Sequence, residues 1–231
     1  MTPPELLNLL PLTVLGALLA LDVVSFPQAM VSRPIVAATA AGALMGYPAR
    51  GLAIGAALEF FALESLPFGA SRYPEWGSAA VVGGALFAMT PDGTPAAMTI
   101  SVLAALLTAS VGGSSMVLLR LRNARVVRRQ QAGIARGSGG TIARLQIAGL
   151  TADLLRGALI TFTGLFVFRS LHPALLASVT MPAMVSRAVV TSVASAVGIA
   201  AVWKIIHVTE GARWWLAGGL AVGLVIAGGL L

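Results

Sequence analysis

Long apolar stretches follow one another along this chain, and polar residues gather in the short segments between them. The apolar residues run continuously and do not alternate one by one, which predicts helices and argues against a membrane β-barrel. A helix needs about 20 apolar residues to cross a bilayer, with about 17 near the lower limit. The apolar segments run approximately over 5–24, 33–47, 51–67, 78–90, 95–119, 147–169, 174–206 and 212–230.

The lengths of these segments are uneven. Segments 33–47 and 78–90 are too short to span alone, whereas 174–206 is long enough for a tilted or broken helix. Short segments interrupted by glycine or proline are typical of re-entrant or discontinuous helices, which hold the substrate in many transporters. The pattern predicts an all-α, polytopic membrane helix bundle with re-entrant or discontinuous helices, forming one membrane-embedded domain over 1–231.

Composition supports a membrane protein. Hydrophobic residues make up 58% of the chain and charged residues only 10%, against about 25% charged in an ordinary soluble domain. The net charge of +7 indicates membrane topology and not nucleic-acid binding, because its source is one juxtamembrane cluster and cytoplasmic loops carry the excess of Lys and Arg. The cluster comprises Arg120, Arg122, Arg125, Arg128, Arg129, Arg136 and Arg144.

We therefore expect 120–146 to be a basic, amphipathic cytoplasmic loop. Within it, GIARGSGG predicts a flexible turn between two short surface helices. The same charges could also bind anionic membrane lipids or a soluble partner.

One pentapeptide occurs twice. Residues 29–33 read AMVSR and recur at 183–187, each copy shortly after a proline. Because transporters are often built from internal repeats whose matching segments flank the binding site, the repeated pentapeptide favours an internal repeat. Coincidence in a chain made from few residue types is the alternative.

Carboxylates inside the apolar segments are candidates for function. A charged side chain at membrane depth costs at least about 2.5 kcal/mol, so it faces a cavity, pairs with a cation such as Arg33, or is protonated. Asp22 ends the first apolar run, and Glu59 lies inside another. Glu64 is separated from Glu59 by about 140° around a helix. We therefore expect Glu59 to face the lumen and Glu64 to lie nearer the exit.

The segment after Glu64 is polar and rich in proline and glycine. Carboxylates, Ser71 and exposed amides, beside Tyr73 or Trp76 as a flat wall, suit a polyol such as a hexose. An ordinary extramembrane loop with an interfacial aromatic residue is the alternative; Glu75 lies in the same segment. Elsewhere, Asp153 lies three residues before Arg156 on a helical segment, which predicts a local ion pair.

The sequence carries no signature of a catalytic site. It has no cysteine, phosphate-binding glycine loop, dinucleotide motif or zinc-ligand spacing. No pattern pairs a serine with either histidine as a nucleophile requires. We therefore expect no intrinsic enzyme activity, no cofactor and no metal.

From Leu21 to Gly84 the chain resembles the IIC subunits of the mannose/fructose/sorbose class of the bacterial phosphotransferase system. The resemblance rests on several motifs in order and with similar spacing. They are LD at 21–22, RP at 33–34, GAALEFFAL at 55–63, GA at 69–70 and PE at 74–75. After this region it is carried only by the basic segment 120–146 and, faintly, by 181–198.

The resemblance implies a multi-pass subunit of the bacterial inner membrane. With a second membrane subunit, IID, it would form the path of a hexose-type sugar, in elevator-like trimers of IIC–IID pairs. Cytoplasmic IIB, phosphorylated by IIA, would transfer phosphate to the emerging sugar. Asp22, Glu59 and Glu75 would be sugar ligands because a carboxylate accepts hydrogen bonds from two adjacent hydroxyls, with Ser71 beside them and Arg33 as cation or brace.

Two other functions stay open on the residues alone. One is a partner-independent secondary transporter or channel that uses Glu59 as a proton or cation site. The other is an orphan IIC-like protein that serves as a sensor or membrane scaffold.

Overall fold

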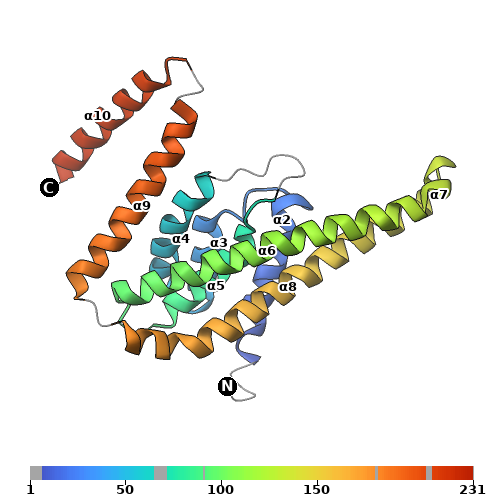
Figure 1. Ribbon diagram of the computed structural model, residues 1–231, viewed down its shortest axis with the longest axis horizontal. Coiled ribbons are helices and arrows are strands. Elements are labelled where there is room, and N and C mark those ends of the chain that lie inside the picture. Colours follow the sequence, from blue (N-terminus) through green and yellow to red (C-terminus); the bar gives the residue numbers. More distant parts are fainter. Residues whose placement is uncertain (1–6, 65–71, 91, 180–181, 207–209, 231) are drawn as a thin grey trace.

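The computed structural model describes residues 7–64, 72–90, 92–179, 182–206 and 210–230, and within them the regular structure is α-helical, without strands. α2 to α5 cluster around a common core, α6 and α8 run side by side into a long projection that ends at α7, and α9 and α10 form a V (Figure 1). The helices are α2 Leu10–Val24, α3 Pro34–Leu44, α4 Pro48–Glu64, α5 Trp76–Ala88, α6 Pro95–Arg129, α7 Gln131–Ala135, α8 Gly139–Ser178, α9 Ala183–Ile206 and α10 Ala212–Leu230.

Two short helices form the centre of the molecule. α3 has 11 residues and α5 has 13, so at 1.5 Å per residue they extend about 16 and 20 Å. Neither length crosses the roughly 30 Å hydrocarbon core of a bilayer. α5 is buried at every position from Gly77 to Ala88. The prediction of an all-α bundle that contains helices too short to span is confirmed.

Glycines let α3 pack tightly between α4 and α5. A Cβ on Gly51 of α4 would lie 2.3 Å from the carbonyl oxygen of Ala38, and one on Gly84 of α5 would lie 2.7 Å from the same atom. The backbones therefore approach to distances that only glycine permits, as small residues allow between membrane helices. By contrast, Gly219 and Gly223 of α10 meet nothing within 4 Å.

We expect Gly51→Ala to destabilise the bundle by about 1–3 kcal/mol, the usual cost of overpacking a close contact. The matched control is Gly219→Ala, which adds the same methyl group to a helix where the space is open. Unfolding of the two variants in detergent by increasing dodecyl sulfate, followed by circular dichroism, measures the difference. Equal stability of the two variants would contradict the packing described for α3.

The basic segment 120–146 differs from the expected loop with two short surface helices. α6 continues through Arg129, and α8 begins at Gly139, so most of the segment extends the two membrane helices into a projecting hairpin (Figure 1). Arginine is a good helix former, and loss of hydrophobicity alone does not end a helix. The chain reverses where Gly137 takes a positive φ of 67° and Ser138 caps α8.

Segment 174–206, which is long enough for a tilted or broken helix, is divided between the end of α8 and α9. α8 continues past His172 and Pro173 to Ser178, and α9 begins at Ala183. The two copies of AMVSR also differ in backbone. Residues 29–33 form a turn in which Met30 has a φ of 62°, whereas 183–187 lie in the first turns of α9. An internal repeat stays a prediction.

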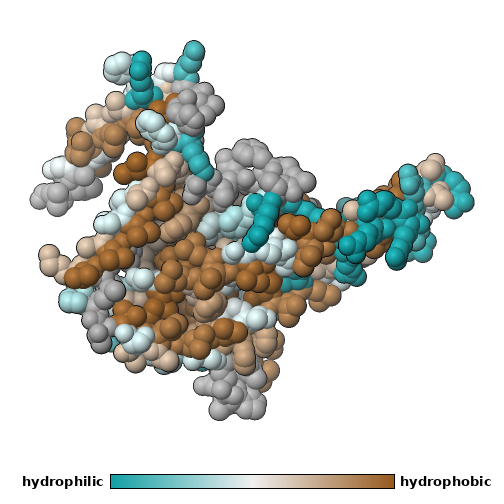
Figure 2. Space-filling view, in the orientation of Figure 1, coloured by the Kyte–Doolittle hydropathy of each residue, from teal (hydrophilic) through white to brown (hydrophobic). Residues whose placement is uncertain are grey.

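The surface is suited to lipid. α6, α8 and residues 187–204 of α9 are long and apolar enough to cross a membrane by length and composition, and four shorter apolar helices accompany them in the described part of the chain. Apolar residues cover much of the face shown in Figure 2, whereas hydrophilic residues gather at the hairpin tip. These features fit a multi-pass membrane protein.

Candidate functional site

A cavity of about 890 Å³ lies at the base of the hairpin, where α2, α6 and α8 meet residues 23–34 and 73–76. Its lining combines acidic, basic, amide and aromatic side chains. The polar and aromatic members are Asp22, Ser25, Gln28, Ser32, Arg33, Tyr73, Trp76, Arg120, Asn123, Gln146 and Asp153.

Asp22 holds the turn that forms one wall of this cavity. It is buried near the C-terminus of α2, and its two carboxylate oxygens accept hydrogen bonds from the backbone N–H groups of Ala29 (2.6 Å) and Ser32 (2.9 Å). Such charge-assisted bonds are about twice as strong as neutral ones. Asp22 therefore fixes the irregular segment between α2 and α3 while it also lines the cavity.

Arg33 follows this turn and is held by Glu59. Its Nε donates to Glu59 Oε1 over 2.7 Å, and its Nη2 also contacts that oxygen. The other oxygen, Oε2, accepts from the backbone N–H of Ile35 in the first turn of α3 (3.2 Å). Because Glu59 is absent from the cavity lining, its contact with the cavity is through Arg33.

Tyr73 and Arg120 close the side nearest the hairpin. An Arg120 guanidinium nitrogen donates to the Tyr73 hydroxyl, and the guanidinium carbon lies 5.0 Å from the centre of the Tyr73 ring. Arg120 belongs to the arginine cluster, but unlike its neighbour Arg122 it lines the cavity. One cation of the hairpin is therefore built into the cavity wall.

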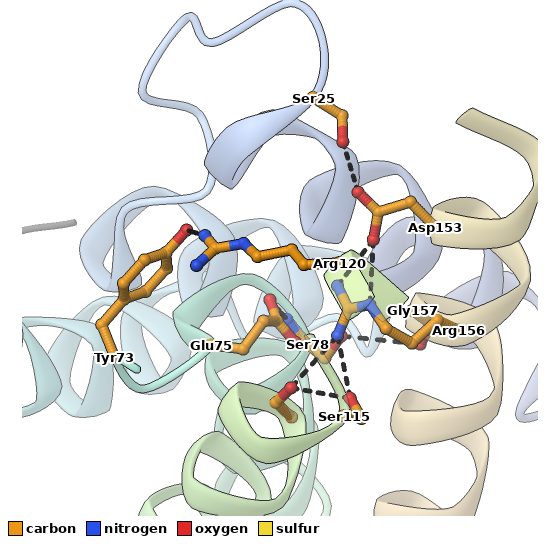
Figure 3. Close-up of polar contacts among 10 residues, drawn as sticks. Ser25, Tyr73, Glu75, Ser78, Ser115, Arg120, Asp153, Arg156 and Gly157 are labelled. Carbon is orange, nitrogen blue, oxygen red and sulfur yellow. Dashed lines mark hydrogen bonds and ion pairs between the residues drawn. The ribbon is translucent and has the colours of Figure 1, made fainter. Parts of the chain in front are cut away.

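A buried ion pair lies beside the cavity. Asp153 is 2% exposed and the Arg156 side chain 8%, and Arg156 Nε donates to Asp153 Oδ1 over 2.9 Å. The Ser25 hydroxyl donates to the other oxygen of Asp153, and Arg156 Nη1 reaches Ser115 Oγ over 3.2 Å. Figure 3 shows this line of contacts crossing from α2 through α8 to α6, with Tyr73 and Arg120 alongside. The predicted Asp153–Arg156 pair is confirmed.

Glu75 lies in the interior at the start of α5. Its Oε1 accepts from the backbone N–H of Ser78 (3.1 Å), and its own N–H donates to the carbonyl oxygen of Ala109 on α6 (2.9 Å). The second oxygen, Oε2, is buried and has no hydrogen-bond partner among the described residues. The Glu75 side chain fits here because residue 112 is glycine. A Cβ added at Gly112 would lie only 2.9 Å from the Cβ of Glu75.

The five residues predicted to bind substrate are thus placed differently. Asp22 and Arg33 line the cavity. Glu59 is bonded to Arg33, Glu75 is buried in contact with Gly112 of α6, and Ser71 lies outside the described residues, as does the side chain of Glu64. Their roles as ligands stay a prediction.

Sequence reasoning missed seven of the polar lining residues. They are Ser25, Gln28, Ser32, Arg120, Asn123, Gln146 and Asp153. Arg120 and Asn123 were expected in a loop, and Asp153 was assigned only to its local ion pair. A signal for Asp153 was present, because a carboxylate in an apolar helix is expected to face a cavity or the bundle interior.

The lining can recognise an uncharged, hydroxyl-rich molecule. Two carboxylates and two guanidinium groups balance in formal charge, while amides and hydroxyls supply donors and acceptors, and Tyr73 and Trp76 supply aromatic surface. The volume lies within the range of about 300–1,000 Å³ typical of small-molecule sites. Among the described residues no group of three potential metal ligands occurs.

Comparison with known families decides the assignment. The model of the sorbose-specific IIC component of the phosphotransferase system matches residues 6–227. The chain belongs to this family. It is therefore a membrane sugar-transport subunit of a phosphotransferase system, and the resemblance drawn from residues 21–84 is confirmed. A IIC component associates with other components of such a system and with sugar, and is not itself the catalytic part.

A solved structure described as "Structure of membrane protein" shares the fold of this IIC chain. The TM-score is 0.74, with 16% sequence identity, 99% of this chain covered and 87% of the other. At this identity the likeness extends to the fold alone. A search among curated proteins found no match.

Proposed function

We propose that the cavity is the sugar site of this IIC subunit and that the sugar passes through it on its way to phosphorylation. The observation that carries the proposal is the lining of the 890 Å³ cavity, in which opposite charges balance beside two aromatic rings. A neutral sugar needs many hydrogen bonds without a net charge, and its apolar face packs on aromatic surface. The hairpin is cytoplasmic by the positive-inside rule, which puts the cavity at the cytoplasmic end.

The positions of Asp22, Arg33, Glu59 and Glu75 support a proposed role for each, and the role of Ser71 is proposed from the sequence alone. Asp22 and Arg33 contact the sugar, since both line the cavity. Glu59 is a positioning residue that holds Arg33. Glu75 offers Oε2 to a hydroxyl when α5 and α6 separate, because this oxygen has no hydrogen-bond partner in the described structure. Ser71 joins them from the segment before Tyr73.

The partners complete the reaction. IID supplies the rest of the sugar path, and IIA phosphorylates IIB, which docks on the arginine-rich hairpin and transfers phosphate to the sugar. The chain acts as one domain in the bacterial inner membrane, in trimers of IIC–IID pairs that move as an elevator. The hairpin tip is hydrophilic (Figure 2) and carries most of the clustered arginines, which suit an acidic partner or the surrounding anionic headgroups.

The test is sugar uptake and phosphorylation by membrane vesicles that contain this chain and its IID, with phosphorylated IIB supplied at the cytoplasmic face. A panel of hexoses that includes sorbose identifies the substrate. Gly149→Trp is the informative variant, because Gly149 lines the cavity and a Cβ there meets only Asn123, at 3.8 Å. The bulky ring fills the site, so we expect uptake to fall at least about tenfold, the equivalent of about 1.4 kcal/mol.

The matched control is Ala174→Trp, an exposed position on the same helix outside both the cavity lining and the hairpin on which IIB is proposed to dock. It should leave uptake unchanged. Uptake of unmodified sugar without partners would replace the proposal with a secondary transporter. An assembled complex that takes up no sugar would favour a sensor or scaffold.

A further inference from the structure

A second hollow lies outside the sugar cavity. It has a volume of about 410 Å³ and follows α8 along Arg144, Ile147, Ala148, Thr151 and Leu155, with Arg122 of α6 at its edge. Arg120 and Arg122 are separated by about 200° around α6, which explains why one lines the sugar cavity and the other this groove. The two sites therefore occupy opposite faces of the hairpin.

Asp153 is the single acidic residue on the two helices that line the groove, α6 and α8. The sequence contains neither Asp nor Glu between Asp92 and Asp153, and Asp153 is buried against Arg156. Arg122 and Arg144 are both exposed. Arg144 Nε donates to the carbonyl oxygen of Gly140 (3.2 Å), which holds its stem along α8. Two guanidinium groups at one end of a groove are suited to a phosphate.

The other end of the groove is apolar. Arg144, Ala148, Thr151, Leu155 and Leu159 recur at the spacing of one helix face, and Leu155 and Leu159 are 64% and 65% exposed. On α6, Leu118 lies one turn from Arg122 and is 68% exposed. From Ile147 to Leu159 the helix rises about 18 Å, slightly more than half of the roughly 30 Å hydrocarbon core. An acyl chain that descends from the arginines would lie along this strip.

We propose that this groove binds one anionic phospholipid, with its phosphate between Arg122 and Arg144 and one acyl chain along Ala148, Leu155 and Leu159. The lipid anchors the hairpin where it leaves the membrane. The site is distinct from the cavity and does not depend on sugar transport. A free phosphate ion would satisfy the arginines but leave the apolar strip unused.

Native mass spectrometry of the full-length chain in detergent tests the proposal, with phosphatidylglycerol and phosphatidylcholine of the same acyl chains added at equal concentration. The wild type is expected to retain one phosphatidylglycerol in preference to phosphatidylcholine. In R122Q/R144Q the apparent Kd for phosphatidylglycerol should rise by about 25-fold, because each arginine near a membrane surface contributes about fivefold. R128Q/R129Q removes the same charge at the end of α6, outside the groove lining, and should change the Kd less than about twofold.

A variant that keeps the charges separates the groove from the surface potential. Ala148→Trp fills the exposed groove, and it too should lose phosphatidylglycerol, while millimolar inorganic phosphate should not displace the lipid from the wild type. Equal retention of the two lipids, or equal loss in the two arginine double variants, would overturn the proposal. The proposal would also be overturned if inorganic phosphate displaced phosphatidylglycerol and Ala148→Trp bound phosphatidylglycerol normally. The arginines would then recognise phosphate alone.

Discussion

Asp153→Ala is expected to lower the free energy of unfolding by about 3–5 kcal/mol, the cost of removing one partner from a buried ion pair. Asp153 and Arg156 are almost entirely enclosed. Without the carboxylate, Arg156 keeps only polar contacts among those described, to Ser115 Oγ at 3.2 Å and to the carbonyl oxygen of Gly112 at 3.4 Å. A guanidinium charge would then remain in the interior without a counter-ion, and the Ser25 hydroxyl would lose its acceptor.

A double-mutant cycle isolates this effect from the loss of packing. Asp153→Leu/Arg156→Met replaces both charges with apolar groups of comparable size, and such replacements of whole pairs are often neutral. We expect the double variant to recover most of the stability that either single variant loses. Unfolding by dodecyl sulfate, followed by circular dichroism, gives the four free energies. Additive losses across the cycle would mean that the two side chains do not act as a pair.

The local pattern of apolar and polar residues was sufficient to predict several helices and the contacts within one helix. The apolar segments 78–90 and 212–230 correspond closely to α5 and α10, because burial in protein or lipid requires a continuous apolar run. Asp153 and Arg156 were paired correctly because residues three apart on a helix are neighbours whatever the fold. The family was recognisable for a related reason, since ordered motifs over about 65 residues survive in the sequence itself.

Contacts between distant segments were not predictable in this way. Ser25 meets Asp153 across 128 positions, and Tyr73 meets Arg120 across 47. Neither pair has a periodic signal, because each depends on how α2, α6 and α8 are arranged. The cavity is made from such contacts, so its lining could not be derived from spacing. Glu59 is a further example. Its place inside an apolar segment was evident from the sequence, but its hydrogen bonds to Arg33 and Ile35 were not.

The hairpin was mispredicted for a different physical reason. Arginine-rich residues after Leu119 were assigned to a loop because hydrophobicity ends there. α6 nevertheless continues to Arg129, and the glycine turn and serine cap that reverse the chain lie only at Gly137 and Ser138. The consequence is functional, because the extended helices bring Arg120, Asn123 and Gln146 to the cavity.

Asp22→Ala is expected to lower sugar transport at least about 100-fold in the assembled system. The substitution removes two charge-assisted hydrogen bonds, each worth about 1.5–3 kcal/mol, that hold Ala29 and Ser32 at the cavity wall. It also removes the carboxylate proposed to accept hydrogen bonds from the sugar. Loss of about 2.7 kcal/mol of binding alone accounts for a 100-fold effect.

Asp22→Asn separates the two roles of this carboxylate. Asparagine keeps the shape and one acceptor oxygen, so it can retain one of the two backbone hydrogen bonds while losing the charge. Gly51→Ala is the matched control, because it destabilises the α3–α4 contact by another route and Gly51 does not line the cavity. Sugar affinity, measured by isothermal titration on folded complexes, is compared with the free energy of unfolding for all three variants.

If Asp22 binds sugar, Asp22→Asn loses far more affinity than Gly51→Ala at a comparable loss of stability. If Asp22 only holds the turn, Asp22→Asn loses no more affinity than Gly51→Ala at a comparable loss of stability, because neither substitution removes a group that contacts the sugar. That second result would assign the sugar contact to the neighbouring Arg33, which depends on the same turn, and Arg33→Gln would then show the larger loss of affinity. The two outcomes differ in which side chain of the proposed site between α2, α6 and α8 meets the sugar.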